Sequence, residues 1–248
     1  MYLITGLGNL LIILAIRTDS HLHTPMYFFL SNLSLADICF TSTTILKMLA
    51  NHVSGNKVIP YSKCLTQVFF FIWFAGIDSF LLTAMAYDCY AAVCVPLHYS
   101  TATYPGVCTL LLAVSWFSTS VNSLTHTTLL TRLSFCGHNE IPHIFCDLSP
   151  RLSILAEPQM KSFINDLMLY TVGVLLIITP FIGILISYTH IFMAVFKIPS
   201  VSGKQKAFST CGSHLVVVSL LYGTLIGVYL NLTSTHTAQK DTAAAMMY

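Results

Sequence analysis

Residues 64–93 read CLTQVFFFIWFAGIDSFLLTAMAYDCYAAV, and this stretch decides the fold class. Its 30 residues contain two charged side chains, Asp78 and Asp88. A membrane-spanning helix needs about 20 predominantly apolar residues. Strands of membrane barrels are about ten residues long and alternate polar with apolar side chains, which this stretch does not do. The stretch therefore predicts a transmembrane α-helix.

The composition of the whole chain agrees with a protein that is solvated by lipid. Hydrophobic residues make up 55% of the 248 residues, and charged residues make up 8%. A typical soluble domain carries about 25% charged residues. A net charge of +2 over this length provides no basic face for nucleic acid. We therefore predict a bilayer-embedded protein that does not bind nucleic acid.

Five more apolar stretches flank the first one, which predicts six spans in all. These spans are residues 1–16, 25–50, 64–93, 105–130, 163–196 and 207–232. Short connections follow the first three spans, so neighbouring helices there are antiparallel. Pro180 lies inside the fifth span and predicts a kink. We expect an all-α membrane protein in which residues 1–248 form a single helical bundle.

The orientation in the membrane is predicted from cysteines, because the distribution of Lys and Arg does not select a side. Cys64 opens the third span, and Cys146 lies in the long fourth connection on the same side of the membrane. A disulfide on that side would require an extracellular or lumenal compartment. On this argument the even-numbered connections are expected to lie outside.

Four stretches of the chain resemble the signature motifs of olfactory receptors, which are rhodopsin-like G-protein-coupled receptors. They are LHTPMYFFLSNLSLADICF (22–40), MAYDCYAAVCVPLHY (85–99), ISYTHI (186–191) and KAFSTCGSHL (206–215). Gly8–Asn9 and the stretch FCGHNEIPHIFCDLSP (135–150) match the family as well. The resemblance runs from end to end, with the motifs in the family's order and spacing.

The resemblance implies a bundle of the seven-transmembrane receptor type. Residues 240–248, KDTAAAMMY, are similar to the entry of a seventh span. The family's outer N-terminal tail and the remainder of its seventh helix have no counterpart in this sequence. We therefore expect a receptor with six spans present, truncated at both ends, in the cell membrane as a multi-pass protein.

Cys89 departs from the family pattern at the inner end of the third span. The family places an arginine after the Asp of this motif, and that cation takes part in the activation switch. A thiol with a pKa of about 8.5 is neutral near pH 7 and cannot replace a guanidinium. We expect Asp88 to lack a partner and to face water, and coupling to a G protein to be weak or absent.

The resemblance also assigns other residues to the inner, G-protein-facing end. Tyr90 follows the altered motif, Tyr188 lies toward the inner end of the fifth span, and Lys206 and His214 lie at the start of the sixth. The implied partner is a heterotrimeric G protein of the stimulatory olfactory type. A single histidine in a helix can equally be a packed residue with no switching role, and this alternative stays open for His214.

Asp37 and Asp78 are acids deep within apolar spans. Ionisable residues in such positions face the bundle interior and pair with another group. The resemblance implies a polar pocket that holds a sodium ion, with Asn9 nearby. The alternative is a pair of protonated or water-bridged acids that only holds the helices together.

The resemblance places a ligand cavity between the outer halves of the third, fifth and sixth spans. Its predicted wall consists of Phe71, Ile72, Ala75, Gly76, Val172, Gly173, Tyr222, Leu225, Ile226 and Tyr229. Small residues open space, aromatic residues line it, and tyrosine hydroxyls offer hydrogen bonds. No residue of this set is charged, which favours small neutral hydrophobic odorants. Each residue could instead only pack helix against helix.

The family's disulfide corresponds to Cys64 and Cys146. Cys136, His138, His143 and Cys146 are also ligand types that suit zinc or copper. A cysteine in a disulfide cannot serve as a thiolate ligand, so we expect the disulfide, no metal at this loop and no cofactor apart from a sodium ion.

Three other functions are alternatives to a receptor. A small transporter or channel would need inverted repeats or a continuous polar path, and the sequence has neither. A non-functional, misfolded product of a damaged gene is the alternative to an odorant receptor with impaired coupling. An enzyme is not expected, because no nucleophile–base set or phosphate-binding loop is present.

Overall fold

The computed structural model describes residues 2–53, 59–99, 105–131, 140–141, 160–197 and 200–234. Long helices occupy most of these residues, and all six predicted spans are helical. They are α1 (Tyr2–Thr18), α2 (Pro25–Val53), α3 (Tyr61–Cys94), α5 (Pro105–Thr131), α7 (Met160–Lys197) and α8 (Val201–Ser234). Each helix continues past at least one predicted boundary. The predicted start of a seventh span, residues 240–248, lies outside the described residues.

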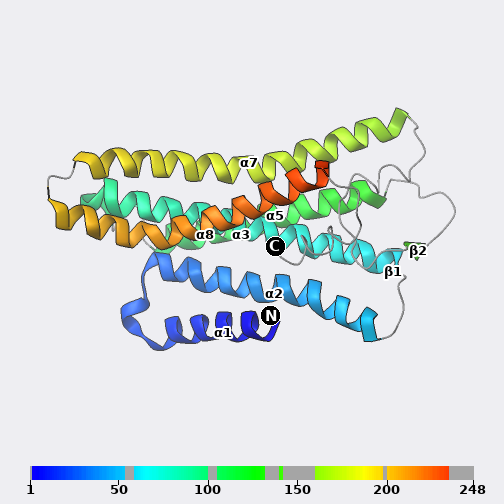
Figure 1. Ribbon diagram of the computed structural model, residues 1–248, viewed down its shortest axis with the longest axis horizontal. Coiled ribbons are helices and arrows are strands. Elements are labelled where there is room, and N and C mark those ends of the chain that lie inside the picture. Colours follow the sequence, from blue (N-terminus) through cyan, green and yellow to red (C-terminus); the bar gives the residue numbers. More distant parts are fainter. Residues whose placement is uncertain are drawn as a thin grey trace.

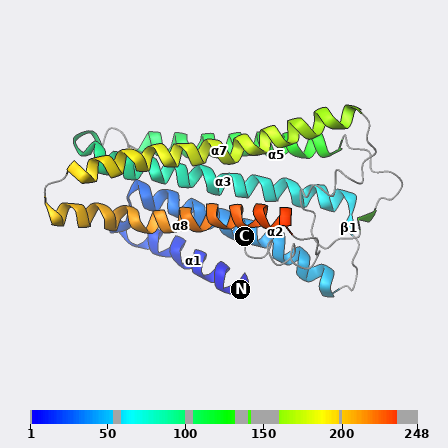
Figure 2. The ribbon, with the colours of Figure 1, turned by 45° about the horizontal axis from the view of Figure 1, so that its top comes forward.

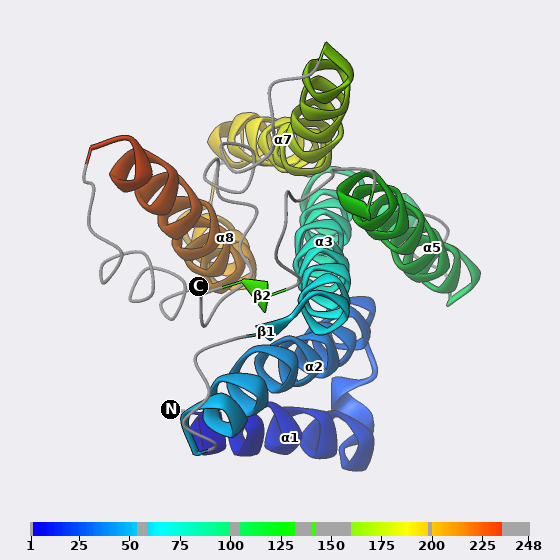
Figure 3. The same cartoon turned by 90° about the vertical axis from the view of Figure 1, so that its right-hand side faces the viewer.

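Helix α3 forms the centre of the bundle. It packs against α2, α5, α7 and α8, whereas α1 packs against α2 at the periphery. Figure 3 shows this arrangement end-on, with α3 surrounded by its four neighbours. In Figure 2, α5 and α7 lie on one side of α3, and α1, α2 and α8 lie on the other. The span that decides the fold class is therefore the most enclosed helix of the bundle.

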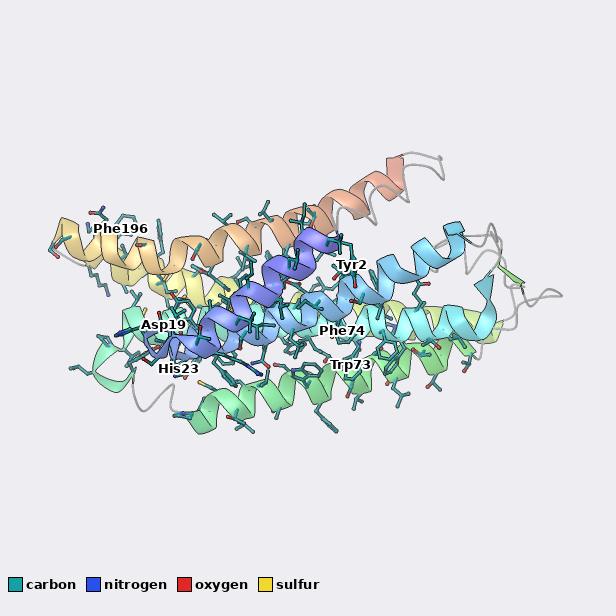
Figure 4. All side chains as sticks on the ribbon, turned by 90° about the horizontal axis from the view of Figure 1, so that it is seen from below. Tyr2, Asp19, His23, Trp73, Phe74 and Phe196 are labelled. Atoms are coloured by element: carbon teal, nitrogen blue, oxygen red, sulfur yellow. The ribbon has the colours of Figure 1, made fainter. Side chains whose placement is uncertain are left out.

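The bundle has two ends, which we name by what lies there (Figure 1). The α7–α8 end holds the connections between α1 and α2, α3 and α5, and α7 and α8, together with the short 3-10 helices η1 (Ser20–Leu22) and η2 (Pro96–His98). Figure 4 places Asp19, His23 and Phe196 together at this end. The opposite end, the β end, holds β1 (Ile59–Pro60) and β2 (Glu140–Ile141).

The β1–β2 pair is an element that the sequence analysis did not predict. The two strands are antiparallel, with Ile59 opposite Ile141. A two-residue ladder is too short to show alternation in the sequence, since strand patterns become readable over four or more residues. The pair brings the start of α3 next to the long connection between α5 and α7.

The core lies along α3 because its apolar side chains meet neighbours on every side. Ile77 and Leu81 are completely buried, in one cluster with Phe29 and Ala36 of α2 and Ile184 of α7. On the side toward α5, the Trp73 indole nitrogen donates to the carbonyl oxygen of Trp116 at 3.4 Å (Figure 4). The indole rings meet edge to face at 5.7 Å.

Helices α3 and α7 are in close contact beside Pro180, which lies inside α7. The Thr83 hydroxyl donates to the Pro180 carbonyl oxygen at 3.2 Å. A Cβ atom at Gly183 would lie 2.9 Å from the Thr83 methyl carbon. The contact therefore favours glycine at this point, because a larger residue would have to displace the Thr83 side chain or push the two helices apart.

The outer surface of the bundle is apolar, as lipid contact requires. Leu11, Phe117 and Leu220 are among the large hydrophobic side chains that are exposed on α1, α5 and α8. Three stretches of the described residues are long and apolar enough to cross a bilayer, namely 65–94, 105–129 and 177–197. Tyr2–Thr18 and Cys211–Gly227 are apolar but shorter.

Candidate functional site

The two intramembrane acids lie together between α2 and α3. Asp37 and Asp78 are close enough for their carboxyl groups to interact electrostatically. Asp78 Oδ1 is buried and has no hydrogen-bond partner among the described residues. Two like charges in a medium of low dielectric constant repel strongly. The pair therefore needs a proton or a cation to neutralise it.

Asn9 lies on α1 and is half-buried. A hydrogen bond of 3.2 Å between the Tyr2 and Ser42 hydroxyl groups sets the antiparallel register of α1 and α2. This register puts Asn9 within about one helical turn of the level of Asp37. The amide is thus on the neighbouring helix and at the height of the acid pair.

The residues of α3 that were predicted to line a ligand cavity lie in the core of the bundle. Ile72 and Gly76 are buried, and Phe71 and Ala75 are half-buried. The Phe71 ring packs on Phe40 of α2, with 5.1 Å between ring centroids. One predicted wall residue thus contacts α2, a helix that the sequence analysis did not include in the cavity.

Tyr222 is the predicted cavity residue of α8 that reaches furthest into the bundle. Its ring lies 4.8 Å from that of Phe181 on α7. Its hydroxyl group is buried and makes no hydrogen bond of normal geometry, although Ser79 of α3 lies near enough to interact. A polar atom from one helix is thereby placed among apolar side chains from the other two.

The remaining predicted cavity residues have three different outcomes. Leu225 packs against the core cluster, whereas Ile226 is 54% exposed on the outer surface of α8. The side chains of Val172, Gly173 and Tyr229 lie outside the described residues. The structure therefore brings Tyr222 and Leu225 to α3 and α7, and places Ile226 apart from them.

A hydrogen-bonded connection joins three helices toward the α7–α8 end. The Tyr188 hydroxyl of α7 lies 2.6 Å from His214 Nδ1 of α8. His214 Nε2 lies 3.0 Å from the carbonyl oxygen of Leu82 in α3. His214 is fully buried, and both of its ring nitrogens have partners. The histidine thus fastens α3, α7 and α8 to one another.

The sequence analysis expects Asp88 to face water, and this expectation is wrong. The residue is 4% exposed, and its Oδ1 accepts a hydrogen bond of 2.9 Å from the Tyr99 hydroxyl. The chain turns back through η2 after α3 ends, and this turn carries Tyr99 under the helix. A tyrosine therefore provides the donor that the sequence analysis did not find for this carboxyl group.

Cys89 fills a closed, apolar position beside Asp88. It is 1% exposed and belongs to a buried cluster with Ile191 and Val195 of α7 and Cys211 of α8. Tyr90 is half-buried, and its ring lies 5.7 Å from that of His190. The side chain of Lys206 lies outside the described residues.

The comparisons with known proteins decide the family. A sequence model described as "Olfactory receptor" matches residues 1–247. The chain belongs to the olfactory receptor family. It is 54% identical to olfactory receptor 1f45 of Rattus norvegicus, 52% identical to olfactory receptor 1N2 of Homo sapiens and 53% identical to olfactory receptor 1M1 of Mus musculus. Each match covers 100% of this chain and 78% of the relative.

Membership in the olfactory receptor family fixes the broad class of the protein. The family consists of G-protein-coupled receptors, which are multi-pass proteins of the cell membrane, and its members are not enzymes. Odorants and G proteins are the ligands and partners that this family implies. The helical bundle has the architecture expected of such a receptor.

The proposed disulfide of this olfactory receptor lies outside the described residues, because neither Cys146 nor the side chain of Cys64 is described. The same holds for Cys136, His138 and His143. Among the residues that are described, no group of three potential metal ligands occurs. The β1–β2 pair lies shortly before both Cys64 and Cys146 along the chain.

Sequence reasoning missed a group of polar residues between α3 and α5. Gln67 Oε1, Asn122 Nδ2 and His126 Nδ1 are buried and have no hydrogen-bond partner in the described part of the olfactory receptor. Ser123 of α5 donates to the Phe69 carbonyl oxygen of α3, which puts Gln67 and His126 at about the same height. The spacing of Ser115, Thr119, Ser123 and His126 along one face of α5 was the available signal.

Proposed function

We propose that this olfactory receptor binds small, neutral, hydrophobic odorants between α3, α7 and α8. The Tyr222 hydroxyl is the observation that carries the proposal. It is buried beside the Phe181 ring and makes no hydrogen bond of normal geometry, and Ser79 of α3 is the polar side chain near it. A buried, unpaired hydroxyl is unfavourable unless a ligand or water supplies a partner. An odorant with one oxygen atom would supply that partner while its hydrocarbon part contacts the apolar wall.

Binding can be tested with Tyr222→Phe. Purified receptor would be screened by thermal shift against matched alcohols, ketones and hydrocarbons of equal size. We expect Tyr222→Phe to weaken binding of oxygenated ligands about tenfold, the equivalent of about 1.4 kcal/mol, and to leave hydrocarbon binding unchanged. Tyr87→Phe, at a tyrosine on the exposed side of α3, is the matched control. Equal weakening of both ligand types by Tyr222→Phe would argue against a specific role for the hydroxyl.

We further propose that a stimulatory olfactory-type G protein is the partner and that coupling is impaired. Cys89 supplies no cation, and its buried position among apolar residues supports this proposal. Cys89→Arg is the first step of a repair. A cAMP assay compares the unaltered chain with Cys89→Arg in cells that display each protein at the surface. Full signalling by the unaltered chain would refute the proposal.

We propose that Asp37, Asp78 and Asn9 form a sodium site. The support is the electrostatic interaction between the two acids and the unpartnered Asp78 Oδ1. Thermal stability should rise with sodium concentration and not with choline. Asp37→Asn should remove this dependence. Thermal stability that does not change with sodium concentration would instead indicate a pair of protonated acids.

We propose that the β end lies outside the cell and the α7–α8 end in the cytosol. The proposal rests on a disulfide between Cys64 and Cys146, and the β1–β2 pair supports it by joining the segments that precede the two cysteines. In the sequence, Lys57 lies in the connection that precedes β1, and Arg151 lies in the connection that follows β2. An impermeant lysine reagent added to intact cells should label Lys57. Labelling of Lys57 only after the plasma membrane is opened would reverse the orientation.

A further inference from the structure

Two buried thiols meet at the α7–α8 end of the bundle. Cys89 of α3 and Cys211 of α8 belong to the same buried cluster, near enough for their thiol groups to interact, and both are almost completely buried. Ile191 and Val195 of α7 complete the apolar cluster around them. A disulfide requires two cysteines whose side chains point at one another across a short gap. Two thiols that share one buried cluster and come from two different helices are candidates for such a bond.

The position of Cys211 is fixed by α7. The Tyr188 hydroxyl donates to the Cys211 carbonyl oxygen at 3.2 Å. The same hydroxyl contacts His214, which lies one turn further along α8. Because two polar contacts hold this turn of α8 against α7, the backbone of Cys211 is kept in place next to the cluster that contains Cys89.

A cavity gives small molecules access to Cys211, one of the two thiols. It has a volume of about 360 Å³ and lies between α7 and α8, with Tyr188, Ile191, Phe192, Cys211 and Leu215 in its wall. Most of the lining is apolar, and Phe192 and Leu215 are exposed on the outer surface of the bundle. A small hydrophobic molecule can therefore reach Cys211 from the membrane side.

We propose that Cys89 and Cys211 are an oxidisable dithiol, which a hydroperoxide converts into a disulfide between α3 and α8. The Cys211 sulfur attacks the terminal oxygen of the hydroperoxide ROOH, the O–O bond breaks, and the alcohol ROH leaves with the thiol proton. Cys211 is then a sulfenic acid. The Cys89 sulfur attacks the Cys211 sulfur, the S–S bond forms, and water leaves. Two thiols are oxidised, and one hydroperoxide is reduced.

The proposal depends on the contact between the two helices and not on signalling. Its functional consequence follows from the location of the bond, since a covalent link would prevent the ends of α3 and α8 from separating. A thiol reductant such as glutathione would reverse the link, as is typical of redox-sensing disulfides in reducing compartments. Cys89, which stands where the family has an arginine, is thus one of the two thiols that make this modification possible.

Cys94 is the competing partner for Cys211. It lies on the same helix as Cys89, contacts the same cluster and interacts electrostatically with Cys211. It is half-buried and more open than Cys89. A test must therefore identify the bonded cysteines and not only count the lost thiols.

The experiment uses the whole chain in isolated cell membranes treated with cumene hydroperoxide. Free thiols are then blocked, the protein is digested without reductant, and the peptides are identified by mass spectrometry. We expect a peptide pair joined through Cys89 and Cys211 that disappears after treatment with dithiothreitol. It should persist in Cys39→Ala, the control at a half-buried thiol on α2, and Cys89→Ala, which cannot form this product, serves as the blank that verifies the assignment.

A second measurement uses only the unaltered chain, so its result does not depend on whether the variants fold. The thermal-unfolding midpoint of the unaltered chain should rise after oxidation, and dithiothreitol should reverse the rise. Recovery of Cys89 and Cys211 as blocked thiols after oxidation would overturn the proposal. A pair joined through Cys94 and Cys211 would overturn it as well.

Discussion

The two halves of the bundle treat their buried polar groups differently. Toward the α7–α8 end, Tyr188, His214 and Asp88 each have a hydrogen-bond partner from another segment. Toward the middle and the β end lie the buried polar atoms without a partner among the described residues. They belong to Gln67, Asp78, Asn122, His126 and Tyr222.

Bonds between helices occur in the second half as well, for example from Ser123 to the Phe69 carbonyl oxygen, but among the described residues that half also holds the unpaired groups. We therefore call the first half fastened and the second half receptive. Hydrogen bonds between membrane helices contribute about 0.6–2 kcal/mol each, and so the paired groups hold α3, α7 and α8 in one arrangement. A buried polar group without a partner costs about 1–3 kcal/mol. The unpaired groups are therefore the places where an odorant, an ion or water gains most by binding.

The largest expected effect comes from breaking the α3–α7 contact in the fastened half. Gly183→Val forces a side chain into the Thr83 methyl group, which is 2.9 Å from the position of a Cβ atom. Overpacking of this kind costs about 1–3 kcal/mol. The thermal-unfolding midpoint in detergent should fall by several degrees. Gly223→Val is the control, because no atom lies within 4 Å of a Cβ atom there. Similar losses at both glycines would mean that helix propensity, and not the contact, is responsible.

Removal of the imidazole that joins three helices should have the next largest effect. His214→Leu deletes the contacts to Tyr188 and to the Leu82 carbonyl oxygen. We expect a loss of about 1–2 kcal/mol, measured as a lower unfolding midpoint. His190→Leu, at an exposed histidine of α7, should change the midpoint little. An unchanged midpoint in His214→Leu would show that this connection does not fasten the bundle.

A smaller effect is expected where η2 meets α3. Tyr99→Phe removes the hydroxyl that donates to Asp88 Oδ1. The loss should be about 1 kcal/mol, since the carboxyl group stays buried without this donor. Asp88→Asn combined with Tyr99→Phe separates the shared part of the effect from the individual parts. Additive losses in this double-mutant cycle would mean that the two side chains do not stabilise each other.

The sequence predicts the helices better than it predicts the contacts between them. Hydropathy places all six helices because lipid requires long apolar runs, and the helices only extend past those runs into polar ends. The burial of Asp88 could not be predicted, since its donor comes from a turn that folds back after α3. The contact between Cys89 and Cys211 joins residues that are far apart in the sequence, and no local pattern reports it.

The candidate site was predicted in part for the same reason. Asp37 and Asp78 could be predicted as site residues, because a charged side chain within an apolar span is recognisable from the sequence without knowledge of how the helices pack. Tyr222 and Ile226 look alike as cavity candidates in the sequence, yet the rotation of α8 buries the first and exposes the second. Gln67 and His126 were overlooked because each is an uncharged polar residue in an otherwise ordinary span.

One pair of variants tests the contrast between the two halves most directly. Tyr188→Phe and Tyr222→Phe delete the same hydroxyl group, from a paired position in one half and an unpaired position in the other. The measurement is the thermal-unfolding midpoint of both variants in the same detergent without odorant. We predict that Tyr188→Phe lowers the midpoint, by about 1 kcal/mol in stability, and that Tyr222→Phe leaves it unchanged or raises it. A fall of equal size in both variants would contradict the account.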